Sequence, residues 1–200
     1  MQRHSYPGAP SLRSRAGFLV GAALALGATA AHADSEVQAL ALVTGVLVVA
    51  AVVTPERLDS DHLAIEVGRF DAIKDVQPAN ALSIEYHFGQ ALWWKLRPFV
   101  GAGATSDRSG YAYAGIRLST WWGPNVEATP SFAVGGYSRG EGKNLGSPPV
   151  LGRFGVDFAY RFDNDLRLGV AYHHMSNGKA FGQTVNPGTE VVGVTLSVPL

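Results

Sequence analysis

From residue 61 onward, apolar and polar side chains alternate in short segments that Gly, Pro, Asn or Asp separate. A side-chain period of two is typical of β-strands with one apolar and one polar face, and the recurring turn residues mark the strand ends. We expect about eight strands of roughly ten residues each. They lie approximately at 61–71, 80–89, 94–105, 110–121, 124–137, 149–162, 165–176 and 189–199. No long helical period competes with them, so the pattern predicts an all-β sandwich or barrel.

The charges on the polar faces distinguish these two folds. The acidic residues Glu66, Glu85, Glu127 and Asp157 are matched by Lys95, Arg97, Arg117, Arg153, Arg161 and Arg167. Such complementary charges fit a closed polar interior inside an apolar outer wall, as in outer-membrane barrels. A sheet in lipid must also close, because its edges would leave backbone groups unpaired. We therefore predict an eight-stranded antiparallel transmembrane outer-membrane β-barrel over residues 61–200.

Aromatic residues and composition agree with this prediction. Tryptophan and tyrosine side chains lie near segment ends, where the aromatic girdles of barrels belong. They are Trp93, Trp94, Trp121, Trp122, Tyr160 and Tyr172. Charged residues make up only 16% of the chain, with 16 basic and 16 acidic residues, so nothing favours a nucleic-acid partner. The absence of cysteine excludes disulfides and thiolate chemistry.

The N-terminus has the pattern of an export signal. Three arginines precede an apolar run at 16–30, which Ala31, His32 and Ala33 follow. This pattern predicts a signal peptide at 1–33, cleaved before Asp34. A second apolar run at 39–53 is too short as a helix for a hydrocarbon core of roughly 30 Å. A strand, a short interfacial helix and a part of the export signal all remain open for it, so 34–60 is a segment of unclear structure.

Candidate chemistry gathers at the last two segments. His174 and Ser176 end the seventh strand, and Glu190 opens the eighth. Antiparallel pairing brings these strand ends side by side. An even strand count with both chain ends in the periplasm places the loop 177–188 at the cell surface. Parity puts all three residues on the outward face, with Leu168 and Val192, whereas His173 points inside.

These residue types can hydrolyse an ester. His174 would remove the hydroxyl proton of Ser176, and Glu190 would orient the imidazole. Asn177 and Gly178 offer donors for an oxyanion. From the trio alone, an ordinary polar rim is a slightly better explanation than an enzyme.

A family resemblance changes this balance. The runs HMSNG at 174–178 and NPGTE at 186–190, followed by a final apolar strand ending VPL, resemble the lipid A 3-O-deacylases of the PagL type. The resemblance implies Ser176 as nucleophile, His174 as base, Glu190 as orienting acid and Asn177 as an oxyanion contributor. It implies hydrolysis of the 3-O-linked hydroxyacyl ester of lipid A at the outer leaflet, with no metal or organic cofactor. The run 39–53 and the length of the loop after Ser176 depart from the family.

Two other functions stay open: a silent structural or adhesive barrel, and an outer-membrane phospholipase or acyltransferase. A homodimer is a further possibility. The histidines His62, His87 and His173 have no metal-ligand spacing. Arg139, Lys143 and Lys179 lie in predicted outer loops and are candidates to contact lipid A phosphates, although solvated loop charges are the default interpretation.

Overall fold

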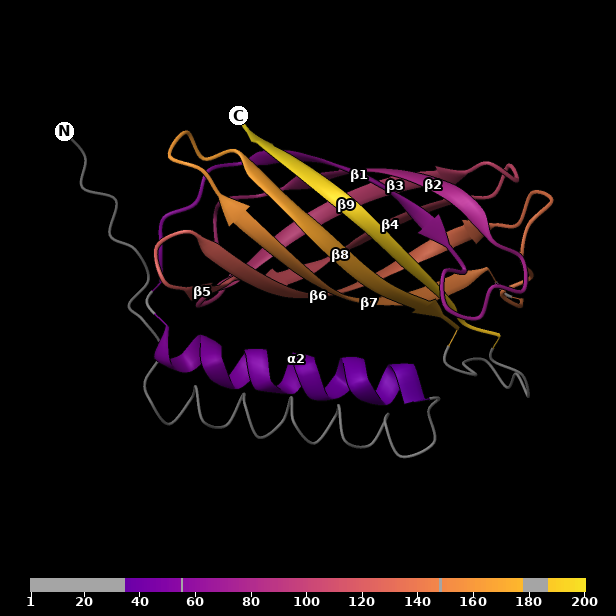
Figure 1. Ribbon diagram of the computed structural model, residues 1–200, viewed down its shortest axis with the longest axis horizontal. Coiled ribbons are helices and arrows are strands. Elements are labelled where there is room, and N and C mark those ends of the chain that lie inside the picture. Colours follow the sequence, from indigo (N-terminus) through magenta and orange to yellow (C-terminus); the bar gives the residue numbers. More distant parts are fainter. Residues whose placement is uncertain (1–34, 55, 148, 178–186) are drawn as a thin grey trace.

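The computed structural model describes residues 35–54, 56–147, 149–177 and 187–200, and the predicted signal peptide lies outside them. Within these residues, helix α2 (Ser35–Val53) precedes nine strands that wrap into a barrel (Figure 1). The strands are β1 (His62–Phe70), β2 (Ala79–His87), β3 (Leu96–Thr105), β4 (Gly110–Leu118), β5 (Thr120–Trp122), β6 (Val126–Ser138), β7 (Val150–Arg161), β8 (Arg167–Ser176) and β9 (Thr189–Pro199).

The sheet closes on itself. Apart from β4 and β5, consecutive strands pair antiparallel with one another, and β1 also pairs with β9. The short β5 continues the direction of β4 past Ser119, and both strands pair with β6. The nine strands therefore occupy eight positions around a closed antiparallel barrel, which confirms the predicted fold.

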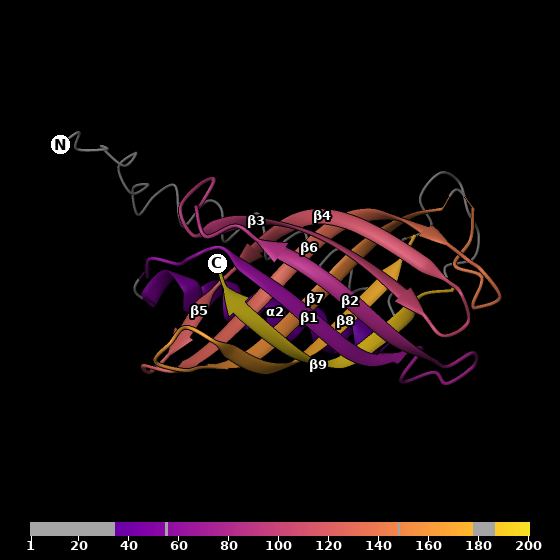
Figure 2. The ribbon, with the colours of Figure 1, turned by 90° about the horizontal axis from the view of Figure 1, so that it is seen from above.

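Both ends of the barrel sequence meet at one end of the barrel, here called the proximal end. The backbone N–H of Leu200 donates to the carbonyl oxygen of Asp61 at 2.9 Å. The end of β8 and the start of β9 lie at the opposite, distal end (Figure 2). The β1–β2, β3–β4 and β6–β7 connections share this distal end.

The alternation along the strands separates a polar interior from an apolar wall. Inside, the Arg153 guanidinium lies 2.7 Å from the Glu85 carboxylate, and the guanidiniums of Arg167 and Arg117 lie 2.9 and 3.3 Å from Glu127. Outside, apolar side chains such as Val194 are exposed. The prediction of complementary interior charges is correct for these pairs.

Lys95 departs from that prediction. Its ammonium donates to the carbonyl oxygens of Ala51 and Thr54, at the C-terminus of α2, and does not join the interior ion pairs described above. The last carbonyls of a helix lack intrahelical partners and carry partial negative charge, so a cation is stabilised there. Lys95 thus fastens the helix to the barrel rather than pairing inside it.

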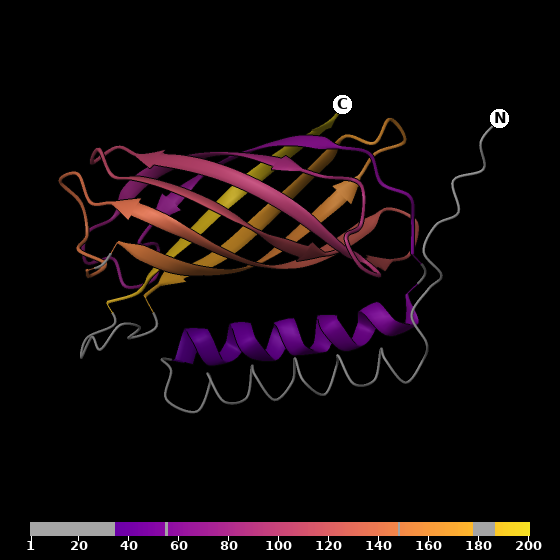
Figure 3. The same cartoon turned by 180° about the vertical axis from the view of Figure 1, so that it is seen from behind.

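The apolar run at 39–53 is helical and lies alongside the barrel (Figure 3). Leu40 and Leu47 are buried against Ala128 and Val156 of the outer wall, so α2 covers an outward-facing part of the sheet. Within the described part of the chain, no helix is both long enough and apolar enough to cross a membrane.

Candidate active site

The pairing of β8 with β9 places His174 directly opposite Glu190. The imidazole Nδ1 lies 3.2 Å from Glu190 Oε1, and both side chains are buried. His174 shares its strand parity with Leu168 and Val170, which are 47% and 56% exposed on the outer wall. The structure therefore brings together the two predicted residues that lie sixteen positions apart, on the outward side of the sheet.

Ser176 lies two residues beyond His174 and shares its side of β8. Gly188 lies next to both His174 and Ser176. A Cβ built on Gly188 would lie 3.2 Å from His174 Nε2 and 3.7 Å from Ser176 Cβ. His174 Nε2 and Ser176 thus border the same small space beside Gly188. Among the described residues, no hydrogen bond joins the Ser176 hydroxyl to the imidazole, and such contacts often tighten only with substrate bound.

The predicted oxyanion residues are only partly described. Asn177 is buried, and its side-chain amide donates to the carbonyl oxygen of Leu145 at 3.1 Å. This bond ties the end of β8 to the β6–β7 loop, so one amide N–H is already used. Gly178 and the predicted phosphate contact Lys179 lie outside the described residues.

His173 points to the other side of β8. Its Nε2 lies 3.3 Å from Glu66 and 3.6 Å from Asp157, among the interior carboxylates. The parity argument therefore separates two adjacent histidines correctly, one among interior charges and one on the outer side of the wall.

Asp71 supports the distal end, although no motif or period in the sequence marks it. Its carboxylate is fully buried, accepts the backbone N–H groups of Val76 and Gln77 and pairs with Lys143. The Thr189 hydroxyl, next to Glu190 in the chain, lies 3.5 Å from the same carboxylate. Burial acts to raise the pKa of Asp71, but the Gln77 and Lys143 hydrogen bonds outweigh it and hold the pKa below its ordinary value.

This pairing changes the interpretation of Lys143. Its ammonium is buried against Asp71 rather than displayed at the surface, so Lys143 is removed from the candidate phosphate contacts. A single aspartate at a strand end gives no pattern from which its three loop partners could be predicted.

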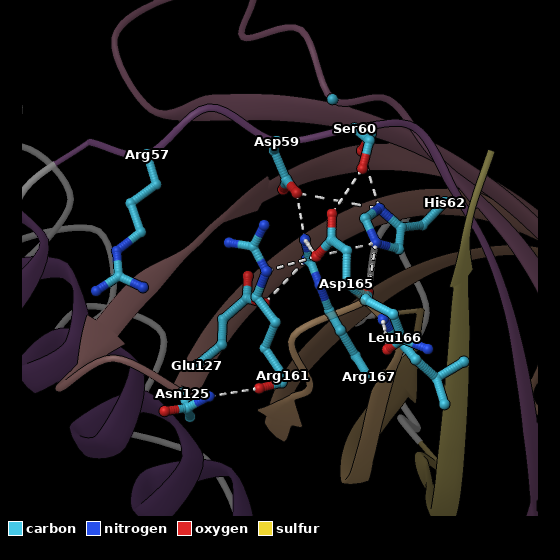
Figure 4. Close-up of polar contacts among 12 residues, drawn as sticks. Arg57, Asp59, Ser60, His62, Asn125, Glu127, Arg161, Asp165, Leu166 and Arg167 are labelled. Carbon is cyan, nitrogen blue, oxygen red and sulfur yellow. Dashed lines mark hydrogen bonds and ion pairs between the residues drawn. The ribbon is translucent and has the colours of Figure 1, made fainter.

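A second polar cluster closes the proximal end (Figure 4). Possible ligand atoms of Asp59, His62 and Asp165 lie within 4.8 Å of one another. However, the Arg167 guanidinium already pairs with both carboxylates. The His62 ring nitrogens lie 2.9 and 3.2 Å from the backbone oxygens of Ser60 and Asp165. Because its acids are already matched by arginine, this arrangement favours an ion-pair cluster over a cation site.

Solved structures similar to this chain are outer-membrane barrels and their designed counterparts. The crystal structure of the outer membrane enzyme PagL aligns over 70% of this chain and 99% of its own, with 18% identity and a TM-score of 0.52. Neisserial surface protein A aligns over 70% of this chain and 96% of its own, with 11% identity and a TM-score of 0.48. A de novo designed transmembrane β-barrel covers 72% of this chain and 98% of its own, with 15% identity and a TM-score of 0.47.

Sequence comparison is more specific. No curated protein matches the chain. The family model "Lipid A 3-O-deacylase (PagL)" matches residues 82–199, which is more than half of the chain and includes His174, Ser176 and Glu190. The chain therefore belongs to the PagL family of lipid A deacylases, ester hydrolases of the outer membrane.

Proposed function

We propose that this protein hydrolyses the 3-O-linked hydroxyacyl ester of lipid A, with Ser176 as nucleophile, His174 as general base and Glu190 as orienting carboxylate. The observation that carries the proposal is the 3.2 Å contact of His174 Nδ1 with Glu190, on the wall that also presents Ser176. A carboxylate on Nδ1 leaves Nε2 free to accept a proton and stabilises the imidazolium that forms.

The reaction has two halves. Ser176 Oγ transfers its proton to His174 Nε2 and forms a bond to the ester carbonyl carbon. The bond from that carbon to the 3-oxygen of lipid A then breaks, and this oxygen takes the proton from the imidazolium. Water next attacks the acyl-serine and gives its proton to His174, which returns it to Ser176 as the hydroxy fatty acid leaves. Backbone N–H groups after Ser176, in the Asn177–Gly178 region, are proposed to stabilise the oxyanion.

The proposal also places the site at the outer leaflet, on the cell surface. Both barrel termini lie at the proximal end and the site lies at the distal end, as expected for an even-stranded barrel with periplasmic termini. Export by a signal peptide at 1–33 belongs to the same proposal. A lipid substrate would then reach the outward-facing Ser176 laterally, from the leaflet itself.

The test is mass spectrometry of lipid A incubated with the refolded protein in detergent micelles. We expect loss of one hydroxyacyl chain and its appearance as free fatty acid. Ser176→Ala and His174→Ala should lower the rate at least about 10³-fold, and Glu190→Gln should be less severe than Ser176→Ala. His173→Ala is the matched control, since the same residue type is removed one position away and on the interior side.

Each competing function predicts a different result. Unchanged lipid A with a correctly folded barrel would overturn the proposal in favour of a structural barrel. Release of acyl chains from glycerophospholipid but not from lipid A would indicate a phospholipase. Appearance of the acyl chain on a second lipid would indicate an acyltransferase.

A further inference from the structure

Helix α2 covers a defined strip of the outer wall. Along the outward face of β7, Val156 is 3% exposed, whereas Phe158 and Tyr160 on the same face are 45% and 48% exposed. The difference arises because Leu40 and Leu47 of α2 pack on Val156 and its neighbour Ala128. Without the helix, this strip would face the same surroundings as the rest of the wall.

The covered strip borders the candidate active site. Phe154 and Tyr172 pack against the cluster that Leu40 and Leu47 form with Ala128 and Val156. Phe154 is the cross-strand partner of His174, and Tyr172 precedes His174 by two residues on the same face. A continuous apolar cluster thus runs from α2 over Val156 to the two side chains that neighbour His174 on the outer face.

The other flank of the site is open. On β9, Val192 and Val194 share the outward face with Glu190 and are 41% and 57% exposed. The catalytic face is therefore asymmetric, with the helix on its β7 side and exposed aliphatic wall on its β9 side. An apolar chain attached to Ser176 would lie along β8, between these two flanks.

The helix runs along the barrel in a defined direction and is attached to it at the proximal end. Its Ser35 end lies toward the distal end of the barrel, and its Val53 end lies toward the proximal end (Figures 1 and 3). At the proximal end, Ala51 packs with Trp94 and Leu118, and Lys95 donates to the last helical carbonyls. The family match begins at residue 82, so α2 lies outside the part of the chain that the family model covers.

We propose that α2 is a fixed wall of the acyl-chain path, and that Leu40, together with Phe154 and Tyr172, determines which acyl chains the enzyme accepts. This inference rests on the proposed ester hydrolysis at Ser176. A fixed wall restricts chain length or branching because an apolar pocket discriminates by roughly 10- to 200-fold per methylene group. The helix would therefore supply substrate specificity, while β8 and β9 supply the chemistry.

The experiment compares Leu40→Ala with Leu42→Ala. Both remove the same atoms from the same helix, but Leu40 is 7% exposed on the barrel side and Leu42 is 70% exposed on the far side. Each variant is incubated with lipid A carrying two hydroxyacyl chains that differ by two methylene groups, and the released fatty acids are quantified by mass spectrometry. We expect Leu40→Ala to raise the relative kcat/KM for the longer chain about tenfold, and Leu42→Ala to leave it unchanged.

Leu40→Phe adds volume at the same point and should shift the preference toward the shorter chain. Leu40→Phe tests the inference by itself if Leu40→Ala does not fold. Unchanged chain preference in the folded Leu40 variants would overturn the inference, as would an intact mass showing that the mature protein begins beyond Val53. Failure of the unmodified protein to release any acyl chain would instead overturn the proposed function.

Discussion

Replacing Gly188 by alanine tests the site with the smallest possible change. The new Cβ would lie 2.9 Å from His174 Cε1 and 3.2 Å from Nε2, whereas carbon atoms in contact prefer about 3.5–4.0 Å. The imidazole must therefore move by roughly 0.6 Å, away from the space that it shares with Ser176. The same movement also changes the geometry of the hydrogen bond between the imidazole and Glu190, which is already 3.2 Å long.

The expected result is a loss of catalysis in a folded protein. Misplacement of a catalytic group by about 1 Å costs up to about 10²-fold, so kcat/KM for lipid A should fall between about 10- and 100-fold. Overpacking of this kind destabilises by about 1–3 kcal/mol, which heat-dependent electrophoretic mobility and urea unfolding would measure. Gly136→Ala is the control, because its Cβ would meet no atom closer than 3.7 Å. Activity within twofold of the unmodified protein in a folded Gly188→Ala variant would refute the placement of reacting groups beside Gly188.

Two further predictions concern the ends of the barrel. Since the folded pKa of Asp71 is below its ordinary value of 3.8, its stabilisation is complete above that pH and is lost as pH falls through the folded pKa. Urea unfolding should therefore show that Asp71→Asn is less stable than the unmodified protein at pH 7. The difference in unfolding free energy between the two proteins should narrow below pH 3.8, and a difference that is independent of pH would contradict a role of the Asp71 charge. Asp59→Asn removes one of the carboxylates that pair with the buried Arg167 guanidinium, while Glu127 remains, so the free energy of unfolding should fall by about 3 kcal/mol. A fall of less than about 1 kcal/mol in urea unfolding would show that the remaining partners compensate fully.

The sequence predicts the barrel well because its two faces differ chemically in every strand. Alternation locates the strands, and the charges on one face identify the interior. The pairing of His174 with Glu190 also follows, since adjacent antiparallel strands joined by one loop bring their ends together. All of these features depend on local period and on neighbours in sequence.

The features that the sequence does not predict depend on contacts between distant segments. The run 39–53 is apolar on all sides, so no periodicity distinguishes a helix from a strand or indicates which face packs. Lys95 has the parity of an interior cation but binds the end of α2, which only the folded arrangement brings near. Asp71 likewise acquires its role from loops more than seventy residues apart in the chain.

The polar interior itself argues that the chemistry belongs on the outside. Buried ion pairs such as Glu85–Arg153 occupy the middle of the barrel, and His173 adds to them with Glu66. An acyl chain inside would have to displace these pairs and leave buried charges unmatched, which costs several kcal/mol for each pair. On the outer wall the same chain meets aliphatic side chains and lipid, and only His174, of the two adjacent histidines, faces that side. The polar interior and apolar outer wall of the barrel thus also favour His174 over His173 in the proposed reaction on a lipid substrate.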